Sequence, residues 1–362
     1  MSARPYAAAP ADPLAAFAAA LPKAELHLHL VGSAAPATVA RLAARHPAAG
    51  VPADTGALRE FFRFRDFPHF IEVYQAVHSL VRSAEDVRTL VTGLARDLAA
   101  HQVRYAEVTV TPYTHLRDGL DGDDLLDGLA RGRAEAAAEH GVDLAWCFDI
   151  PGERGPRAGL ETAVFALRNR PEGLVSLGLG GPELGVGRAL FTEAFTLARE
   201  AGLHSVPHAG ETTGPATIWS ALHDLGAERI GHGTSCVHDP RLLDHLAEHR
   251  VPVEVCPTSN VRTRQVGSID AHPVRRMLDH GLLVTLNTDD PPMFGATLTG
   301  EYLAVARSLG LGRDELAALA RNAARAAFMA EPARARLLAE IDGLVAATPW
   351  TYPPAPDEAA EA

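Results

Sequence analysis

Eight short apolar runs, each ending at Gly, Pro or a polar residue, constrain the fold of this 362-residue chain more than any other feature. The runs lie at residues 24–30, 103–110, 143–150, 174–180, 203–208, 229–232, 251–257 and 282–287. Between most neighbours lies an Ala-, Leu-, Arg- and Glu-rich pattern typical of a helix, such as EDVRTLVTGLARDLAAH before the second run. Because parallel strands need helical crossovers, this alternation predicts an α/β fold, the (β/α)8 TIM barrel. A doubly wound sheet is the alternative, but no G-x-G-x-x-G follows any run.

The chain is expected to form one domain with short extensions. We expect residues 21–345 to form the barrel, residues 1–20 a flexible N-terminal segment and residues 346–362, which are Pro-rich and acidic, a frayed tail. The connection after the first strand is too long for an ordinary β/α loop. It predicts a helical insertion at about 35–100 that lies over the barrel mouth.

Composition excludes several classes of partner. A net charge of −12 argues against nucleic acid, since binding to its phosphates needs a basic patch. No window supplies the roughly 18 apolar residues of a membrane helix, and prolines interrupt the Ala-rich N-terminus where a signal peptide would need a continuous apolar stretch. The three cysteines, Cys147, Cys236 and Cys256, are scattered and form no C-x-x-C, so they indicate neither disulfides nor a cysteine metal site. The cytoplasm is therefore the expected compartment.

Polar residues gather where the predicted strands end. They are His27 and His29 in the first run, His208 and Glu211 at the fifth, His232 at the sixth, and Asp289 and Asp290 at the eighth. Because the chemistry of such barrels lies at the C-terminal ends of the strands, we expect these side chains to share one rim.

Each of these signals is ordinary alone: H-x-H occurs in many strands, and Asp-Asp-Pro can simply begin a turn or cap a helix. Together they indicate more. Asp289 and Asp290 emerge from a nearly continuous apolar run, and two adjacent buried carboxylates repel unless a cation or a proton offsets them. Neutral imidazoles with a carboxylate are a zinc-type ligand set, so the sequence predicts a metal site.

These residues closely resemble the adenosine deaminase family of zinc aminohydrolases, which has a (β/α)8 fold. The matching segments appear in the family's order between about residues 21 and 330: LPKAELHLHLVGS, YAEV, GLGGPE, HAGET, RIGHGTS, VCPTSN and LNTDDPPMFGATLTGEY. Any one segment is a weak signal, whereas the set is specific.

The resemblance implies a role for each residue in the release of ammonia from a 6-aminopurine. It makes His27, His29, His208 and Asp289 the ligands of one Zn²⁺, with Fe²⁺, Co²⁺ or Mn²⁺ as alternatives on the same ligands. It implies that Glu211 donates a proton to purine N1, that His232 orients the attacking hydroxide, that Asp290 pairs with N7, and that the backbone N–H of Gly181 meets N3.

One position departs from the family pattern. Members that act on adenosine usually read H-x-H-x-D-G or H-x-H-x-E-G, and the resemblance implies that this acid contacts the ribose 5′-hydroxyl. Val31 stands there instead and can form no hydrogen bond through its side chain. This favours a 5′-modified purine nucleoside such as 6-amino-6-deoxyfutalosine, of the futalosine route to menaquinone, whose 5′ chain ends in a benzoate. Arg63 and Arg65, within FFRFRDF, are candidate partners for that carboxylate.

Other functions remain open at this point. Adenosine or 2′-deoxyadenosine deamination in purine salvage is the main alternative, since another residue could meet the 5′-hydroxyl. Adenine deamination and another metal-dependent hydrolysis are less favoured. A ligand-sensing barrel without activity should have lost Glu211, His232 or Asp290, and all three are present.

Overall fold

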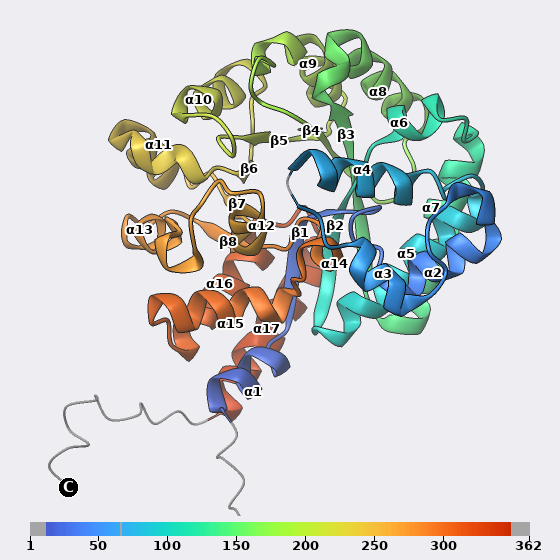
Figure 1. Ribbon diagram of the computed structural model, residues 1–362. Coiled ribbons are helices and arrows are strands. Elements are labelled where there is room, and N and C mark those ends of the chain that lie inside the picture. The colour runs from blue at the N-terminus through green and yellow to red at the C-terminus, as the bar shows by residue number, and fades with distance from the viewer. Residues whose placement is uncertain (1–11, 66, 349–362) are drawn as a thin grey trace, which may run out of the picture.

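The computed structural model describes residues 12–65 and 67–348, and within them eight parallel strands pair in sequence order around a barrel (Figure 1). The strands are β1 (Lys23–His29), β2 (Val103–Val110), β3 (Asp143–Pro151), β4 (Leu174–Gly180), β5 (His204–Ala209), β6 (Ile230–His232), β7 (Val253–Val255) and β8 (Val284–Leu286). The predicted (β/α)8 fold is confirmed.

The last two strands are shorter than the runs that predicted them, 251–257 and 282–287. Prolines flank β7, because Pro252 precedes it and Pro257 begins the following helix. Proline lacks the N–H that a ladder hydrogen bond needs. Beyond β8, the side-chain oxygen of Asn287 accepts from the N–H of Leu26 at 2.9 Å, so a side chain replaces a main-chain partner there.

Helices surround the barrel and cap its strand ends. They are α1 (Pro13–Ala20), α2 (Pro36–Arg45), α3 (Thr55–Phe61), α4 (Phe67–His78), α5 (Ala84–Ala100), α6 (Pro112–Arg117), α7 (Gly122–Glu135), α8 (Gly155–Asn169), α9 (Thr192–Glu200), α10 (Pro215–Asp224), α11 (Pro240–Glu248), α12 (Pro257–Arg262), α13 (Val274–Asp279), α14 (Pro291–Phe294), α15 (Leu298–Leu309), α16 (Arg313–Ala326) and α17 (Glu331–Ala347). The short helices α6 and α12 begin after a one-residue segment that follows β2 and β7, respectively, and α14 begins after a four-residue segment that follows β8; each has a proline in its first turn.

Helices α2, α3 and α4 occupy the region of the expected insertion, and α4 lies across the end of the barrel in Figure 1. Aromatic packing holds this region against the segment after β8, since the ring centroids of Phe70 and Phe64 lie 5.0 and 5.9 Å from that of Phe294. Helix α5 packs on α7 and β2 and is therefore the crossover helix of the barrel.

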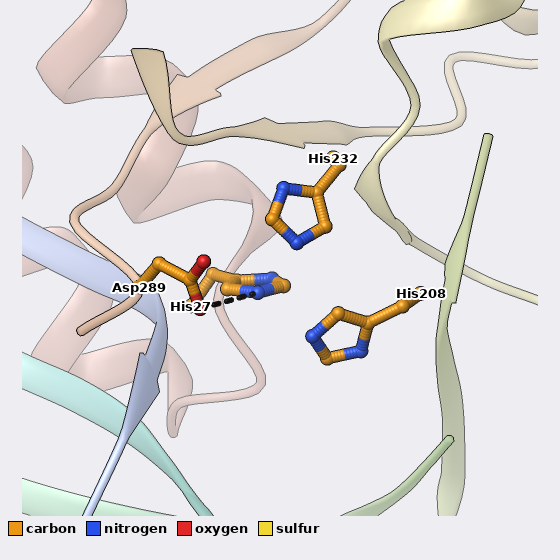
Figure 2. A group of neighbouring side chains, drawn as sticks. All are labelled: His27, His208, His232 and Asp289. Atoms are coloured by element: carbon orange, nitrogen blue, oxygen red, sulfur yellow. Dashed lines mark ion pairs between the residues drawn. The ribbon is translucent and has the colours of Figure 1, made fainter. Parts of the chain in front are cut away.

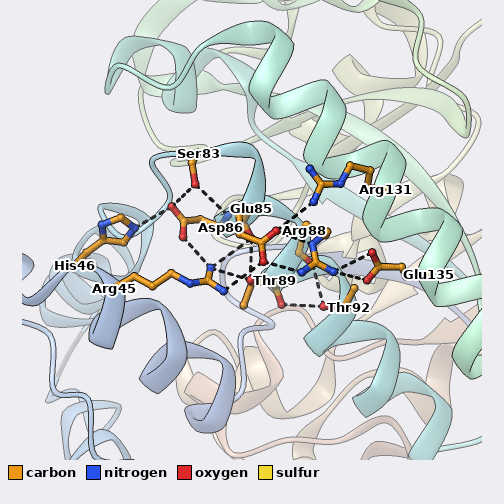
Figure 3. Close-up of polar contacts among 10 residues, drawn as sticks. All are labelled: Arg45, His46, Ser83, Glu85, Asp86, Arg88, Thr89, Thr92, Arg131 and Glu135. Carbon is orange, nitrogen blue, oxygen red and sulfur yellow. Dashed lines mark hydrogen bonds and ion pairs between the residues drawn. The ribbon is translucent and has the colours of Figure 1, made fainter.

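A network of ion pairs ties α2 to α5 and α7 (Figure 3). The buried carboxylate of Asp86 accepts from Arg45 at 3.0 Å and lies 2.9 Å from Nε2 of His46, while Arg88 bonds both Glu85 and Glu135 at 2.6 Å. Asp86 is almost fully buried, so its pairing with basic side chains at the C-terminal end of α2 and just after it fixes the start of the insertion on the barrel wall.

The N-terminal expectation is wrong in part. Residues 13–20 of the segment expected to be flexible form α1, because Asp12 caps the helix, Pro13 opens it and the apolar side chain of Phe17 is buried. Residues 1–11 lie outside the described residues. At the other end α17 continues to Ala347, and most of the expected tail, 349–362, also lies outside them.

Two expectations from composition can be compared with the structure. Within the described ranges, no helix combines the length and the apolar character that crossing a bilayer would require. The three cysteines are buried and free: Cys147, Cys236 and Cys256.

Candidate active site

Four side chains from distant parts of the chain converge at the C-terminal ends of the strands. Their potential ligand atoms all lie within 4.8 Å of one another: His27 of β1, His208 of β5, His232 of β6 and Asp289 beyond β8 (Figure 2). All four residues are buried. The rim predicted from the strand ends therefore exists, and it gathers three imidazoles and a carboxylate.

Two of these residues adopt a backbone conformation that residues other than glycine seldom adopt. The φ angle is 59° at His232 and 65° at Asp289, both in the left-handed region. Glycines flank His232 on both sides, and a Cβ at Gly231 would lie only 2.9 Å from Cε1 of His27. Unfavourable dihedrals of this kind persist where the surrounding fold imposes them, and they concentrate at functional sites.

The orientation of His27 suits a metal ligand. Its Nδ1 lies 2.9 Å from Oε2 of Glu254, whose other oxygen accepts from Arg229 at 2.6 Å. Burial raises the pKa of Glu254, but Arg229 and His27 offset this and hold the pKa below its ordinary value. The ionised carboxylate then accepts a hydrogen bond from Nδ1–H, so the neutral ring has its lone pair on Nε2. That buried Nε2 has no hydrogen-bond partner among the described residues, as expected of an atom that binds a metal.

His29 lies beside the cluster and contacts its carboxylate. Its Nε2 is 3.2 Å from Oδ1 of Asp289, and its ring centroid is 5.4 Å from that of His208. The second oxygen of Asp289 accepts from the hydroxyl of Ser259 at 2.7 Å. Asp289 therefore directs one oxygen toward the histidines while Ser259 holds the other.

A chain of hydrogen bonds determines the tautomer of His232. It begins at the N–H of Val274, an unambiguous donor, which lies 3.2 Å from Nδ1 of His272. Burial lowers the pKa of His272 to about 4, so this neutral ring carries its proton on Nε2 and donates to Oδ1 of Asn260 at 3.2 Å. The Asn260 amide must then donate to Nδ1 of His232, 3.3 Å away. His232 consequently carries its own proton on Nε2.

This tautomer separates the roles of two histidines. A protonated nitrogen cannot bind a metal, so Nε2 of His232 is a hydrogen-bond donor, and it lies 3.6 Å from Oε2 of Glu211. If His29 takes the place of His232, the potential ligands are three imidazoles and one carboxylate, which is the donor set of a catalytic zinc site. With the orphaned Nε2 of His27, the residues present fit a divalent metal ion.

The pKa values of two further acids in the site are shifted toward the protonated form. Burial raises the pKa of Glu211. Burial also raises the pKa of Asp290 well above its usual range, and the neighbouring carboxylate of Asp289 adds to the shift. A Cβ on Gly32 would lie 1.5 Å from Oδ1 of Asp290, so only glycine at this position leaves room for that carboxyl group.

The other predicted residues lie after β1, after β4 and in the insertion. Gly181 follows β4 with a φ of 78°, and Val31 is buried after β1. The side chains of Arg63 and Arg65 are exposed; Arg63 pairs with Glu60 of its own turn at 3.1 Å. The structure thus brings neither guanidinium to the cluster.

Sequence reasoning missed several supporting residues. Glu183 accepts from the backbone N–H groups of Thr212 and Thr213 at 2.8 and 2.9 Å, and so positions the loop that carries Glu211. Glu254 alternates into the barrel interior within VPVEVCP, and that alternation could have revealed it. Ser259, Asn260 and His272 act through contacts that no sequence spacing indicates.

Asp149 of β3 is a further buried acid that sequence reasoning missed. Burial raises its pKa to about 7, and its Oδ1 has no partner within the described part of the chain. Added Cβ atoms at Gly178 and Gly180 would each lie 2.7 Å from one of its oxygens. The glycines of GLGGPE therefore make room for this carboxyl group.

Known proteins resemble this chain over most of its length. The adenosine deaminase family model matches residues 22–344. The aminodeoxyfutalosine deaminase of Streptomyces avermitilis is 55% identical over 94% of this chain and 95% of its own length, and an adenine deaminase of Streptomyces coelicolor is 39% identical over 89% and 95%. An amidohydrolase crystal structure from Burkholderia ambifaria, with bound zinc, superposes with a TM-score of 0.84 at 25% identity and covers 95% of this chain and 96% of that one.

Proposed function

This chain belongs to the adenosine deaminase family, and on that premise we propose that it is a metal-dependent hydrolase that removes the 6-amino group of 6-amino-6-deoxyfutalosine as ammonia. The observation that carries the reaction class is the buried cluster of His27, His208 and Asp289 beside the proton-bearing His232. The substrate is taken from the relative that is 55% identical. The futalosine route to menaquinone is then the pathway that the enzyme serves.

The metal ligands that we propose are His27, His29, His208 and Asp289. A divalent cation bound by these residues would acidify water toward a pKa of about 7 and so would provide a nucleophile at neutral pH. We favour Zn²⁺, which the similar Burkholderia ambifaria structure contains, over Fe²⁺, Co²⁺ or Mn²⁺. Glu254 supports the site by fixing the ring of His27, and Ser259 does the same for Asp289.

The other residues move protons and orient the purine. Protonated Glu211 gives its proton to purine N1 as the tetrahedral centre forms at C6, general acid catalysis that is typically worth about 10²–10⁴-fold. The Nε2–H of His232 donates to the attacking oxygen and directs it toward C6. Protonated Asp290 donates to N7, an acceptor, and the backbone N–H of Gly181 meets N3. The raised pKa values of both acids support these assignments.

Val31 supports a substrate without a free 5′-hydroxyl. Its side chain is buried and apolar, so a hydroxyl placed against it would lose its hydrogen bonds to water, at a cost of about 1–3 kcal/mol. A carbon substituent at the 5′ position avoids this cost. Adenine deamination is the second candidate, because an adenine deaminase from Streptomyces coelicolor is 39% identical.

Ammonia release by the metal-loaded protein tests this proposal. We expect 6-amino-6-deoxyfutalosine to be converted to its 6-oxo product with a higher kcat/KM than adenosine or adenine, and we expect chelation of the metal to stop the reaction. Turnover of adenosine or adenine alone would overturn the substrate assignment. Full activity of metal-free protein would overturn the mechanism.

A further inference from the structure

A small cavity adjoins Val31 at the ends of β1 and β2. Its volume is about 40 Å³, and its walls include Val31, Tyr74, His78, Thr109, Thr111 and His115. A cavity of this size has room for about two or three water molecules. It therefore accommodates one small polar group such as a carboxylate, but not a benzene ring.

Two histidines in the wall have unsatisfied nitrogens. His78 of α4 and His115 of α6 stack with ring centroids 4.3 Å apart and an interplanar angle of 21°. Within the described ranges, Nε2 of His78 and Nδ1 of His115 are buried without a hydrogen-bond partner. Leaving such a group unpaired costs about 1–3 kcal/mol, so native proteins usually complete it with water or a ligand.

The donors of this cavity suit an anionic acceptor. No hydrogen bond within the described part of the chain fixes the tautomer of His115, so Nδ1 is free to carry the proton and donate. Burial lowers the pKa of His78, whereas Asp118, 3.2 Å from its Nδ1, acts in the opposite direction. A second carboxylate at Nε2 would add to the effect of Asp118 and favour the doubly protonated ring. The threonine hydroxyls add donors that rotate freely. The residues that line the cavity include no carboxylate that would repel an anion.

The cavity lies beside the residues that follow β1, next to the proposed purine site. Val31 forms part of its wall, and the next residue, Gly32, packs directly against the carboxyl group of Asp290. Tyr74 forms another part of the same wall. A substituent that leaves the 5′ carbon past Val31 would be directed toward this cavity.

We propose that the cavity binds the carboxylate at the far end of the substrate's 5′ substituent, with His115 and His78 as its hydrogen-bond partners and with Val31 and Tyr74 against the ring that carries it. This inference rests on the proposed function. It assigns the recognition of the benzoate to buried imidazoles rather than to the exposed Arg63 and Arg65.

Two substrates and matched variants test the assignment. The substrates are 6-amino-6-deoxyfutalosine and 5′-deoxyadenosine, which shares the purine and ribose but has no carboxylate. We expect H115A and H78A each to lower kcat/KM for 6-amino-6-deoxyfutalosine at least tenfold, mainly through KM, with kcat/KM for 5′-deoxyadenosine within twofold of the parent enzyme. H115Q, which keeps a donor, should recover part of the loss. H280A, at an exposed histidine, is the control.

The outcomes separate this inference from the proposed function. An equal fall on both substrates would indicate a structural role for the histidines, and no fall on either would show that they do not contact the substituent; each result overturns the inference alone. If the parent enzyme does not prefer 6-amino-6-deoxyfutalosine to 5′-deoxyadenosine, the proposed function fails, and the inference fails with it. The methyl ester of the substrate, which lacks the charge, should react like 5′-deoxyadenosine in every variant.

Discussion

His29 and Asp289 meet twice, through their main chains and through their side chains. The N–H of His29 donates to the carbonyl of Asp289 at 2.9 Å, while Nε2 of the same histidine lies 3.2 Å from Oδ1 of the same aspartate. The N–H of Asp289 also donates to the carbonyl of His27 at 3.0 Å. These two main-chain hydrogen bonds, which help to close the barrel between β1 and the segment after β8, are thus made by the proposed metal ligands themselves. The same residues therefore help to close the barrel and form the proposed metal site.

Replacing Gly32 with alanine should disable the purine site without removing the metal. The new Cβ would lie 1.5 Å from Oδ1 of Asp290, so that carboxyl group must move. Misplacing a substrate-positioning group by about 1 Å can cost on the order of 10²-fold in rate, and we expect a fall of that size in kcat/KM. Metal content should stay at one per chain. G267A is the control, because an added Cβ there meets nothing within 4 Å, and wild-type kinetics in G32A would contradict the placement of Asp290.

Replacing Asn260 with aspartate should move the proton of the neutral His232 ring from Nε2 to Nδ1. An aspartate accepts from His272 and also from Nδ1 of His232, so the neutral His232 ring would lose its Nε2 proton. Wrong-tautomer variants of other hydrolases lose several orders of magnitude, and we expect a loss of at least about 10²-fold at pH 8.5. A kcat/KM equal to that of the wild type would rule out the relay.

Replacing Glu254 with glutamine should weaken metal binding. The amide oxygen still accepts from Nδ1 of His27, but the negative charge that makes the ring a better ligand is lost, and Arg229 loses an ionic partner. Changes to such supporting groups typically cost about 10–100-fold in metal affinity. Competition with a chromophoric chelator measures this directly. Affinity equal to that of the wild type would mean that Glu254 has no influence on His27.

Stability should depend on the ionisation of Glu301 between about pH 4.5 and 7. Burial raises the pKa of this carboxyl group from 4.5 to about 7. The folded state therefore favours the neutral acid. The stability that goes with neutral Glu301 is fully present below pH 4.5 and is lost as the pH rises through 7. E301Q, which stays neutral, should be more stable than the wild type at pH 8 by on the order of 1–3 kcal/mol and should match it at pH 4.5. Thermal melting at both pH values tests this, and a constant difference would contradict it.

Much of this molecule could be predicted because its signals are local or topological. The eight apolar runs mark the strands, and parallel pairing then places His27, His208 and Asp289 on one rim although the first and the last are 262 positions apart. The resemblance to a family supplied their roles. Helix α1 was missed because its Asp12 cap and the burial of Phe17 depend on packing that composition does not reveal.

Other features of the site depend on three-dimensional contacts. The relay from His272 through Asn260 joins residues whose spacing follows no helical or strand period. The positive φ of His232 and Asp289 is imposed by the closed barrel, since neither residue type requires it. The stacked pair of His78 and His115 brings together α4 of the insertion and α6, which follows β2. Such features become visible only once the strands are placed.

Competition among substrates in one reaction tests the central claim most directly. The metal-loaded enzyme is given equal concentrations of 6-amino-6-deoxyfutalosine, adenosine and adenine, and the loss of each is followed by chromatography, so that the relative rates report the ratios of kcat/KM. The arrangement around Val31 and the stacked histidines predicts that 6-amino-6-deoxyfutalosine is consumed at least tenfold faster than either competitor. Faster consumption of adenosine or adenine would contradict it.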